Sequence, residues 1–232
     1  MTKPQYLRIK DELTRQIHAG GLHKLPSERQ LCELFSTTRV TIREALAQLE
    51  ASGLIYRQDR RGWFVSPPRL RLNPRVTSNF HQIVAEQGGE AKTEVLDATR
   101  QPVPPALRDR WRMKPLETLF VIRRLRFLNG RAVCYCENYC LPQQVPDLLS
   151  HNLAGSLTEL YRRHYNLEYA RMQVRFRPTA LPDDVAGLLA ATAGLPALHL
   201  ERLNYDQFGR VLDFDIEYWR HDSLEIEVDT AD

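Results

Sequence analysis

The sequence predicts a two-domain α+β protein, with a small helical domain first and a larger, mainly antiparallel sheet domain after it. The 232 residues are enough for two ordinary domains. Residues 1–75 carry 14 lysines and arginines against 7 acidic residues, although the whole chain has a net charge of only +3. Residues 66–75, with three prolines and three arginines, separate a helical pattern from alternating strands. These observations predict a basic domain at 1–68, a linker at 69–76 and a second, acidic domain at 77–232.

The composition also excludes some classes of protein. The chain has no apolar run near the roughly 20 residues that cross a bilayer, and its first residues lack the layout of a secretion signal. Its four cysteines are too few for a disulfide scaffold and are expected to be reduced. We therefore expect a cytoplasmic protein.

The first two helices are predicted from spacing and capping residues. Pro4 suits a first helical turn, and the glycine pair at 20–21 ends a helix whose apolar stripe is Tyr6, Ile9, Leu13 and Ile17. Ser27 can cap a short second helix, and Gln30 can complete a capping box with it. The predicted apolar face of this second helix consists of Leu31, Leu34 and Phe35.

A third helix is expected after the turn-forming residues 36–38, with Gly53 as its C-terminal cap. Its predicted buried positions are Val40, Ala45, Leu46 and Leu49. Its exposed start carries side chains suited to DNA, namely Thr38, Arg39, Thr41 and Arg43. Two helices joined by a tight turn, with such side chains opening the second helix, are typical of proteins that read the DNA major groove.

Two short strands, 54–56 and 63–65, enclose a basic turn with Arg60, Arg61 and Gly62. A turn of this kind can contact phosphates or the adjacent minor groove. Arg39 and Arg43 lie four residues apart and share a helix face, and pairing of arginine with guanine is the commonest specific contact. The front domain is therefore predicted to bind double-stranded DNA. The alternative is a solvated basic face, with Arg29 and Arg43 paired to neighbouring glutamates.

The second domain alternates strands with short helices. Asn129-Gly130 is a strong hairpin signal. Helices are expected near residues 80–84, at 156–165 and at 183–191, and strands at 93–99, 119–128, 132–141, 172–177, 199–206 and 211–219. Such a mixture indicates an α+β domain with a largely antiparallel sheet.

Several polar residues of this domain are candidates for binding a charged ligand. Arg124 and Arg126 share a strand face, where they repel each other unless an anion or a carboxylate lies between them. Ser156 opens a helix, where its hydroxyl and free N–H groups could hold anion oxygens. The alternatives are cross-strand pairing of the arginines with acidic neighbours and a plain helix cap.

The acidic residues suggest a partner for an ammonium group. Glu137 is expected on the strand opposite the arginines, and Asp213, Asp215 and Glu217 share one strand face. The alternative is the wet side of a half-buried strand. No metal site is predicted, because supporting ligands are missing around these acids and the nearby thiols lack paired spacing; these thiols are taken as small apolar residues, namely Cys134, Cys136 and Cys140.

Residues 22–65 resemble the winged helix-turn-helix of the GntR (gluconate repressor) family of bacterial transcription regulators. The matching motifs are LPSER at 25–29, TRVTIREA at 38–45 and RGWFV at 61–65, although the loop before Leu25 is shortened and lacks the usual glycine. The resemblance implies that Arg29 holds a backbone phosphate. It also implies DNA contacts for the helix start and the wing, at Thr38, Arg39, Thr41, Arg43, Arg61 and Gly62.

Residues 77–231 resemble the UTRA domain of the HutC subfamily, whose fold is related to chorismate lyase. The matching stretches are VIRRLRFLNGRAVCYCENYCLP, GSLTELYRRHY and RLNYDQFGRVLDFDIEYWRHDSLEIEV. Within the subfamily they resemble regulators of 2-aminoethylphosphonate uptake and degradation (PhnR-like), although Cys136 stands where an acidic residue is usual. The resemblance places phosphate-like groups at Arg124 and Arg126, and it gives Asn79 a part in holding the anion.

Together these features predict a homodimeric regulator that binds operator DNA, needs no cofactor and responds to 2-aminoethylphosphonate or a related phosphonate. A regulator of the same class that responds to a sugar phosphate or a histidine-pathway metabolite is one alternative. A DNA-tethered, lyase-like enzyme is another, although the sequence shows no catalytic arrangement. A third is an architectural DNA-binding protein whose second half only dimerises.

Overall fold

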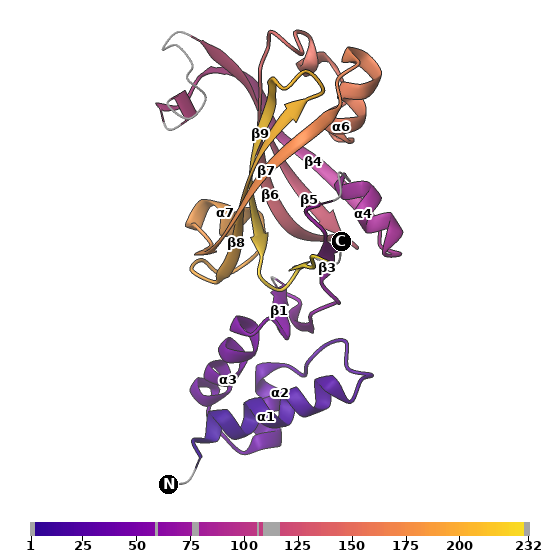
Figure 1. Ribbon diagram of the computed structural model, residues 1–232. Helices are drawn as coiled ribbons and strands as arrows, with labels where there is room; N and C mark the ends of the chain where they lie inside the picture. The colour runs from indigo at the N-terminus through magenta and orange to yellow at the C-terminus, as the bar shows by residue number, and fades with distance from the viewer. Residues whose placement is uncertain (1–2, 59, 76–78, 106, 109–116, 230–232) are drawn as a thin grey trace.

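The first domain is a three-helix unit followed by a β-hairpin. The computed structural model describes residues 3–58, 60–75, 79–105, 107–108 and 117–229. The helices are α1 (Gln5–His18), α2 (Glu28–Phe35) and α3 (Arg39–Ala51), and the antiparallel hairpin joins β1 (Ile55–Gln58) to β2 (Gly62–Val65). Ser27 and Gln30 form the predicted capping box of α2. Figure 1 shows this unit below the larger domain.

The core of the first domain follows the predicted periodicity, with two exceptions. The buried cluster contains Ile9, Leu13, Leu31, Ala45, Leu46 and Leu49, as expected, together with Ile42. Leu34 and Val40, which were predicted to be buried, are 64% and 76% exposed. Because α3 begins at Arg39, its buried face starts at Ile42, and Val40 points outward from the first turn.

The second domain is built on a six-stranded antiparallel sheet. The strand order is β4-β5-β6-β9-β8-β7. The strands are β4 (Ala91–Pro102), β5 (Thr118–Leu128), β6 (Arg131–Cys140), β7 (Tyr169–Ala180), β8 (Pro196–Asp206) and β9 (Val211–Arg220). The predicted turn joins β5 to β6, and both Asn129 and Gly130 adopt positive φ, as a two-residue hairpin of this type requires.

Helices cover both faces of this sheet (Figure 1). We call the face that carries α4 (Phe80–Glu86) and α6 (Leu157–Leu160) the inner face. Helix α6 continues into a π-helical turn, Tyr161–Tyr165. On the outer face, α7 (Asp183–Leu188) packs on Leu125 and Tyr135. A short 3-10 helix, Leu148–Ser150, contributes to the cluster beneath α6.

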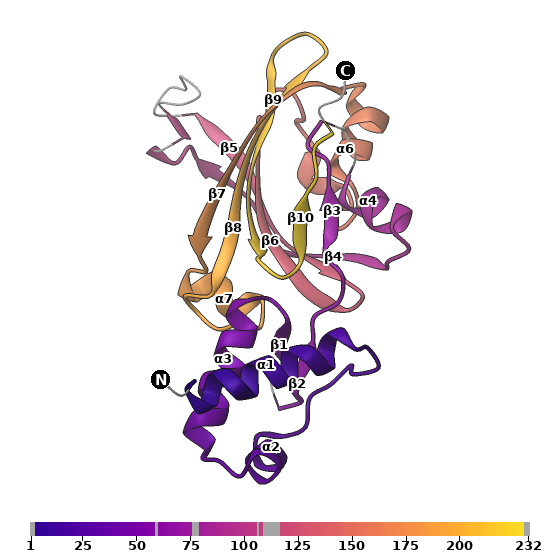
Figure 2. The same cartoon turned by 60° about the horizontal axis from the view of Figure 1, so that its bottom comes forward.

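Part of the segment expected to be a linker is a strand. Residues Leu70–Leu72 form β3, which pairs in parallel with β10 (Leu224–Ile226), and Figure 2 shows the two side by side over the inner face. The side chains of Leu70, Leu72 and Leu224 are buried there beside α4. The chain therefore enters the second domain through its core. In the described part of the chain, no helix has the length and apolar character that a membrane crossing requires.

Candidate functional site

A basic groove lies on the first domain between the start of α2, the start of α3 and the β1–β2 turn. It brings together predicted DNA-contacting residues from three segments of the sequence, namely Arg29, Arg39 and the turn residues Arg60, Arg61 and Gly62. Lys24 and Arg57, which the sequence analysis did not single out, line the same groove. This density of positive charge in one concave surface suits a phosphate backbone.

The start of α3 presents its polar side chains next to this groove. The hydroxyl of Thr38 accepts a hydrogen bond from the Thr41 amide over 3.3 Å and so caps the helix. The two hydroxyl oxygens lie 3.1 Å apart. Arg39 is exposed at the first turn and Arg43 at the second. The exposed polar side chains therefore open α3, as the sequence predicted, and their contact with a major groove stays a prediction.

The predicted alternative of pairing with glutamates is also present. Arg43 Nε donates to Glu28 over 2.9 Å, and Arg29 Nη1 donates to Glu33 over 3.3 Å. Both arginine side chains are about 70% exposed. Exposed pairs of this kind contribute only about 0–1 kcal/mol, so a DNA phosphate can replace either glutamate at little cost.

The wing is organised around an aromatic ring. Lys24 Nζ lies 5.3 Å from the centre of the Phe64 ring, and the Arg61 guanidinium lies 5.4 Å from it. Gly62 adopts φ +96°, a left-handed backbone that favours glycine. The ring therefore holds two cations at the base of a tight turn, where both can face DNA.

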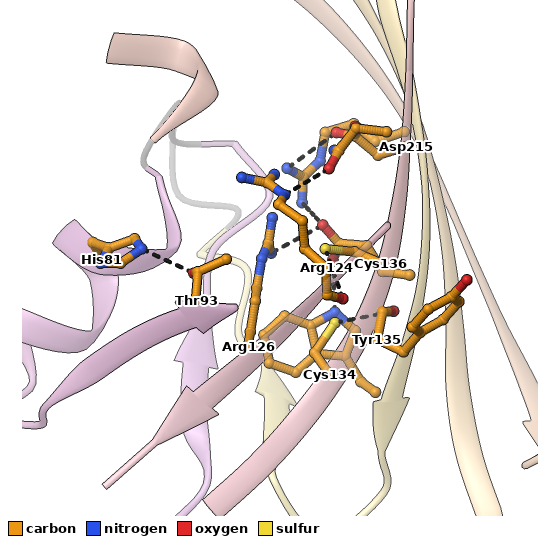
Figure 3. Close-up of polar contacts among 12 residues, drawn as sticks. His81, Thr93, Arg124, Arg126, Cys134, Tyr135, Cys136 and Asp215 are labelled. Carbon is orange, nitrogen blue, oxygen red and sulfur yellow. Dashed lines mark hydrogen bonds and ion pairs between the residues drawn. The ribbon is translucent and has the colours of Figure 1, made fainter. Parts of the chain in front are cut away.

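A second candidate site is a cavity, partly open to solvent, under α4 and the start of α6 on the inner face of the sheet. Five predicted effector residues line it: Asn79, Arg124, Arg126, Ser156 and Asp215. Figure 3 shows Arg124 and Arg126 projecting from β5 toward the side on which His81 and Thr93 lie. Further lining residues that were not predicted include His81, Thr93, Asn138, Arg202 and Trp219.

Three guanidinium groups line this cavity beside two carboxylates. Arg126 Nη1 lies 3.0 Å from Glu217 Oε1, and Arg202 lies 3.9 Å from Glu217 and 4.0 Å from Asp215. Arg124 donates instead to the Asn138 side chain and, over 3.3 and 3.2 Å, to the carbonyl oxygens of residues 153 and 155. The site therefore has more positive than negative groups, and one arginine has no carboxylate partner among the contacts of the described residues.

The charged groups around the cavity shift the pKa values of Arg126, Glu217 and His81. Burial is the largest influence on Arg126 and by itself lowers its pKa, but the neighbouring acidic groups, Glu217 first among them, together raise this pKa above its usual value. Burial raises the pKa of Glu217, and the guanidinium groups of Arg126 and Arg202 bring it below its usual value. Burial and then the two arginines of β5 lower the pKa of His81, whose Nε2 lies 3.0 Å from the Thr93 hydroxyl.

Two predicted residues in the cavity act as helix caps. Asn79 accepts from the Gln82 amide at the start of α4, and Ser156 accepts from the Glu159 amide at the start of α6. For Ser156, the plain-cap alternative and a place in the cavity wall are therefore both realised, and Asn79 likewise combines a cap with a place in the wall.

The prediction for Glu137 requires correction. Its side chain lies on the outer face of the sheet, where Arg123 Nε donates to it over 3.0 Å and the hydroxyls of Tyr135 and Tyr139 also donate. Side chains alternate along a strand, so Asn138, one residue on, is the β6 residue that faces the cavity. Glu137 therefore cannot contact a ligand bound there.

The acidic face of β9 is buried rather than wet. Asp213, Asp215 and Glu217 are 0%, 4% and 0% exposed, so the solvated-strand alternative was wrong. Asp215 lines the cavity. Glu217 instead forms an ion pair with Arg126 and accepts a hydrogen bond from the indole N–H of Trp219 over 2.6 Å. Asp213 lies outside the lining and accepts from the Tyr169 hydroxyl and the Asn204 amide, each over 2.6 Å.

The thiols of the sheet occupy buried positions, as predicted. Cys134, Cys136 and Cys140 are free and fully buried on the inner face. Within the described ranges, no group of three histidine, cysteine or acidic side chains is arranged to hold a metal ion.

Asp213 makes the stability of the protein depend on pH. Burial, and then the nearby Asp215, raise the pKa of Asp213 to about 7. Between its ordinary pKa and 7, the folded protein holds a proton that the unfolded chain has lost. The corresponding stabilisation therefore falls by about 1.4 kcal/mol per pH unit as pH rises through this window. We expect the stability advantage of the wild type over Asp213→Asn to shrink from pH 5.5 to 7.5.

Urea unfolding of both proteins across this range provides the measurement. His81 and His199, whose pKa values burial lowers, produce the opposite trend, but they do so in both proteins and cancel in the difference. A constant difference between the two unfolding free energies would contradict a pKa near 7 for Asp213.

The comparisons with known proteins cover both domains. The model of the family described as "Bacterial regulatory proteins, gntR family" matches residues 5–65, and that of the UTRA domain matches residues 86–225. The chain is 34% identical over 219 residues to the uncharacterized HTH-type transcriptional regulator YihL of Escherichia coli K12, covering 94% of this chain and 91% of that protein. It is 25% identical over 222 residues to the HTH-type transcriptional repressor NagR of Bacillus subtilis, with the same coverage.

Solved structures show the same architecture. The crystal structure of PhnF from Mycobacterium smegmatis superposes with a TM-score of 0.68 at 21% identity, covering 96% of this chain and 99% of that one. YydK of Bacillus subtilis gives 0.59 at 21% identity, covering 99% and 100%. These similarities confirm the predicted two-domain α+β fold. The matching families and relatives are transcription regulators rather than enzymes, so the lyase-like alternative is set aside.

Proposed function

Because the chain belongs to the GntR family of bacterial transcription regulators and carries a UTRA domain, we propose that the basic groove binds operator DNA and the cavity binds a small anion. As a homodimer, the protein would place two winged domains on half-sites one helical turn, about 34–36 Å, or a multiple of it apart. Anion binding would then favour one arrangement of the dimer over another.

One observation carries the choice of an anion, namely the excess of buried guanidinium groups over carboxylates in the cavity. Glu217 and Asp215 compensate Arg126 and Arg202, and Arg124 is held by neutral acceptors alone among its contacts in the described residues. A phosphate or phosphonate group carries about −1.5 to −2 charges near neutral pH, by analogy with a phosphorylated side chain, and binds best to such forks. The hydroxyl groups of Thr93 and Ser156 lie in the same wall and can supply further donors.

The effector that we propose is 2-aminoethylphosphonate or a related phosphonate. Its phosphonate group would bind at Arg124 and Arg126. Its ammonium group would bind at Asp215, the acidic residue in the cavity wall. A sugar phosphate shares the anionic head and is the second candidate, and the two compounds differ in whether they need a carboxylate in the pocket wall.

A thermal unfolding screen tests this proposal. A ligand at 100 times its Kd stabilises a protein by about 2.7 kcal/mol, which raises the Tm of a chain of this size by roughly 5–10 °C. We expect this increase with 2-aminoethylphosphonate, and we expect Arg124→Gln to remove it. Arg163→Gln is the matched control, because Arg163 is 68% exposed and pairs with Glu159 at the surface. No shift with phosphonates, but a shift with sugar phosphates, would overturn the choice of effector and leave the anion site in place.

A further inference from the structure

The two domains meet at a buried cluster of charged residues, which we call the domain joint. Its centre is Asp222, which accepts hydrogen bonds from Arg131 Nη2 and, over 3.1 and 3.3 Å, from Arg220 Nε and Nη2. Arg131, Arg220 and Asp222 are 9%, 2% and 1% exposed. The cluster sets two buried guanidinium groups against one carboxylate, so both arginines depend on the position of Asp222.

The first domain contacts the joint through both α3 and β1. The Arg131 guanidinium lies 3.7 Å from the centre of the Tyr56 ring in β1. His221 Nε2 donates over 3.0 Å to the carbonyl oxygen of Glu50, in the last turn of α3. The Glu50 side chain is only 6% exposed, and its burial raises its pKa. The helix that presents Arg39 to DNA is thus anchored at its other end by the joint (Figures 1 and 2).

The turn between α3 and β1 fits closely against the joint. Gly53 adopts φ +76°, and a Cβ atom there would lie 3.0 Å from Arg69 Nη2 and 3.2 Å from Asp222 Cβ. A side chain there would require its neighbours to move by a few tenths of an ångström, so the turn packs closely against Asp222. Close packing of this kind allows a movement of Asp222 to reach the end of α3.

The joint is also continuous with the cavity. Trp219 directly precedes Arg220, and Leu224 follows the 221–223 turn; both side chains line the cavity. Trp219 donates to Glu217, which pairs with Arg126. On the other side, the Leu70 amide donates over 2.9 Å to the carbonyl of residue 223, and this joins the turn to the strand that leads from the first domain.

We propose that the domain joint couples the cavity to the orientation of the winged domain. An anion at Arg126 changes how Glu217 and Trp219 are held, residues 219–224 adjust, and the Arg131–Asp222–Arg220 cluster carries the change to Tyr56 and to the end of α3. The inference rests on the proposed function. Coupling of this kind is reciprocal, so DNA binding changes effector affinity by the same factor.

The first experiment measures this coupling. The wild-type protein selects a DNA duplex from a random-sequence pool, and its Kd for this duplex is measured with and without 2-aminoethylphosphonate. We expect a coupling factor of about 5 to 150 in the wild type. In Arg131→Met and in Tyr56→Leu it should fall to within about twofold of one, while effector affinity without DNA stays within about threefold of the wild type. Arg210→Met is the matched control, because it breaks an arginine–aspartate pair in the β8–β9 turn.

Full coupling in both joint variants would overturn the proposal. Loss of coupling in Arg210→Met would overturn it as well, because the loss would then not be specific to the joint. If 2-aminoethylphosphonate does not bind the wild type, the choice of effector fails. A double-mutant cycle measured without any ligand then tests the joint. Trp219→Phe removes the indole donor to Glu217 and should change the Kd for DNA. If the joint couples the two domains, the change in Kd caused by Trp219→Phe should vanish in the Tyr56→Leu background. Additive effects of the two substitutions on the free energy of DNA binding would overturn the proposal. If the protein selects no DNA at all, the proposed function fails together with the joint.

Discussion

Replacing Arg126 with methionine should lower the free energy of unfolding by about 3–5 kcal/mol, because the substitution leaves the carboxylate of Glu217 buried without its closest cation. Glu217 is fully buried, and the next guanidinium, that of Arg202, lies 3.9 Å away against 3.0 Å for Arg126. Arg126 also stacks on the Phe80 ring at 5.3 Å, a contact that methionine only partly replaces. Urea unfolding at neutral pH measures the loss.

The double variant Arg126→Met/Glu217→Gln separates charge from packing. Glutamine keeps an oxygen that can accept from the Trp219 indole but removes the uncompensated charge. We therefore expect the double variant to regain most of the lost stability. An equal loss in the single and double variants would assign the effect to packing around Phe80.

Much of the fold could be predicted because local patterns determine it. Strand alternation, the Asn129-Gly130 turn and the cap at Ser27 each act over a few residues, and the structure shows all of them. The strand at 70–72 could not be predicted, because it is three residues long and its partner at 224–226 lies at the far end of the chain. Pairing over such a separation leaves no local signal.

Some residues of the candidate site could likewise be predicted from local patterns, and others could not. Arg124 and Arg126 could be assigned to one face because residues two apart on a strand share a face. Arg202 and His81 reach the cavity from β8 and α4, so only the packing of these elements brings them there. The strand pattern puts Arg202 on the same face as Asn204, but it does not show that this face lines a cavity. The prediction for Glu137 failed because its face depends on the register between β5 and β6, in which Arg124 pairs with Cys136.

At the DNA surface, Arg39→Ala should weaken binding to the selected duplex by about 1–3 kcal/mol, or roughly 5- to 150-fold in Kd. Arg39 is exposed in the first turn of α3 and lines the basic groove, where a guanidinium can pair with a guanine. The loss should come with a relaxed preference at one base position, measured by repeating the selection with the variant.

Arg29→Ala should behave differently, because a phosphate contact carries no sequence information. We expect it to weaken binding to all duplexes alike and to reduce the slope of log Kd against log salt concentration by about one. Arg15→Ala is the control for both, since Arg15 lies on α1 in an exposed pair with Glu12, outside the groove. If Arg39→Ala lowered binding to random duplexes as much as to the selected one, Arg39 would be a phosphate contact, and the reading of bases would fall to other residues at the start of α3.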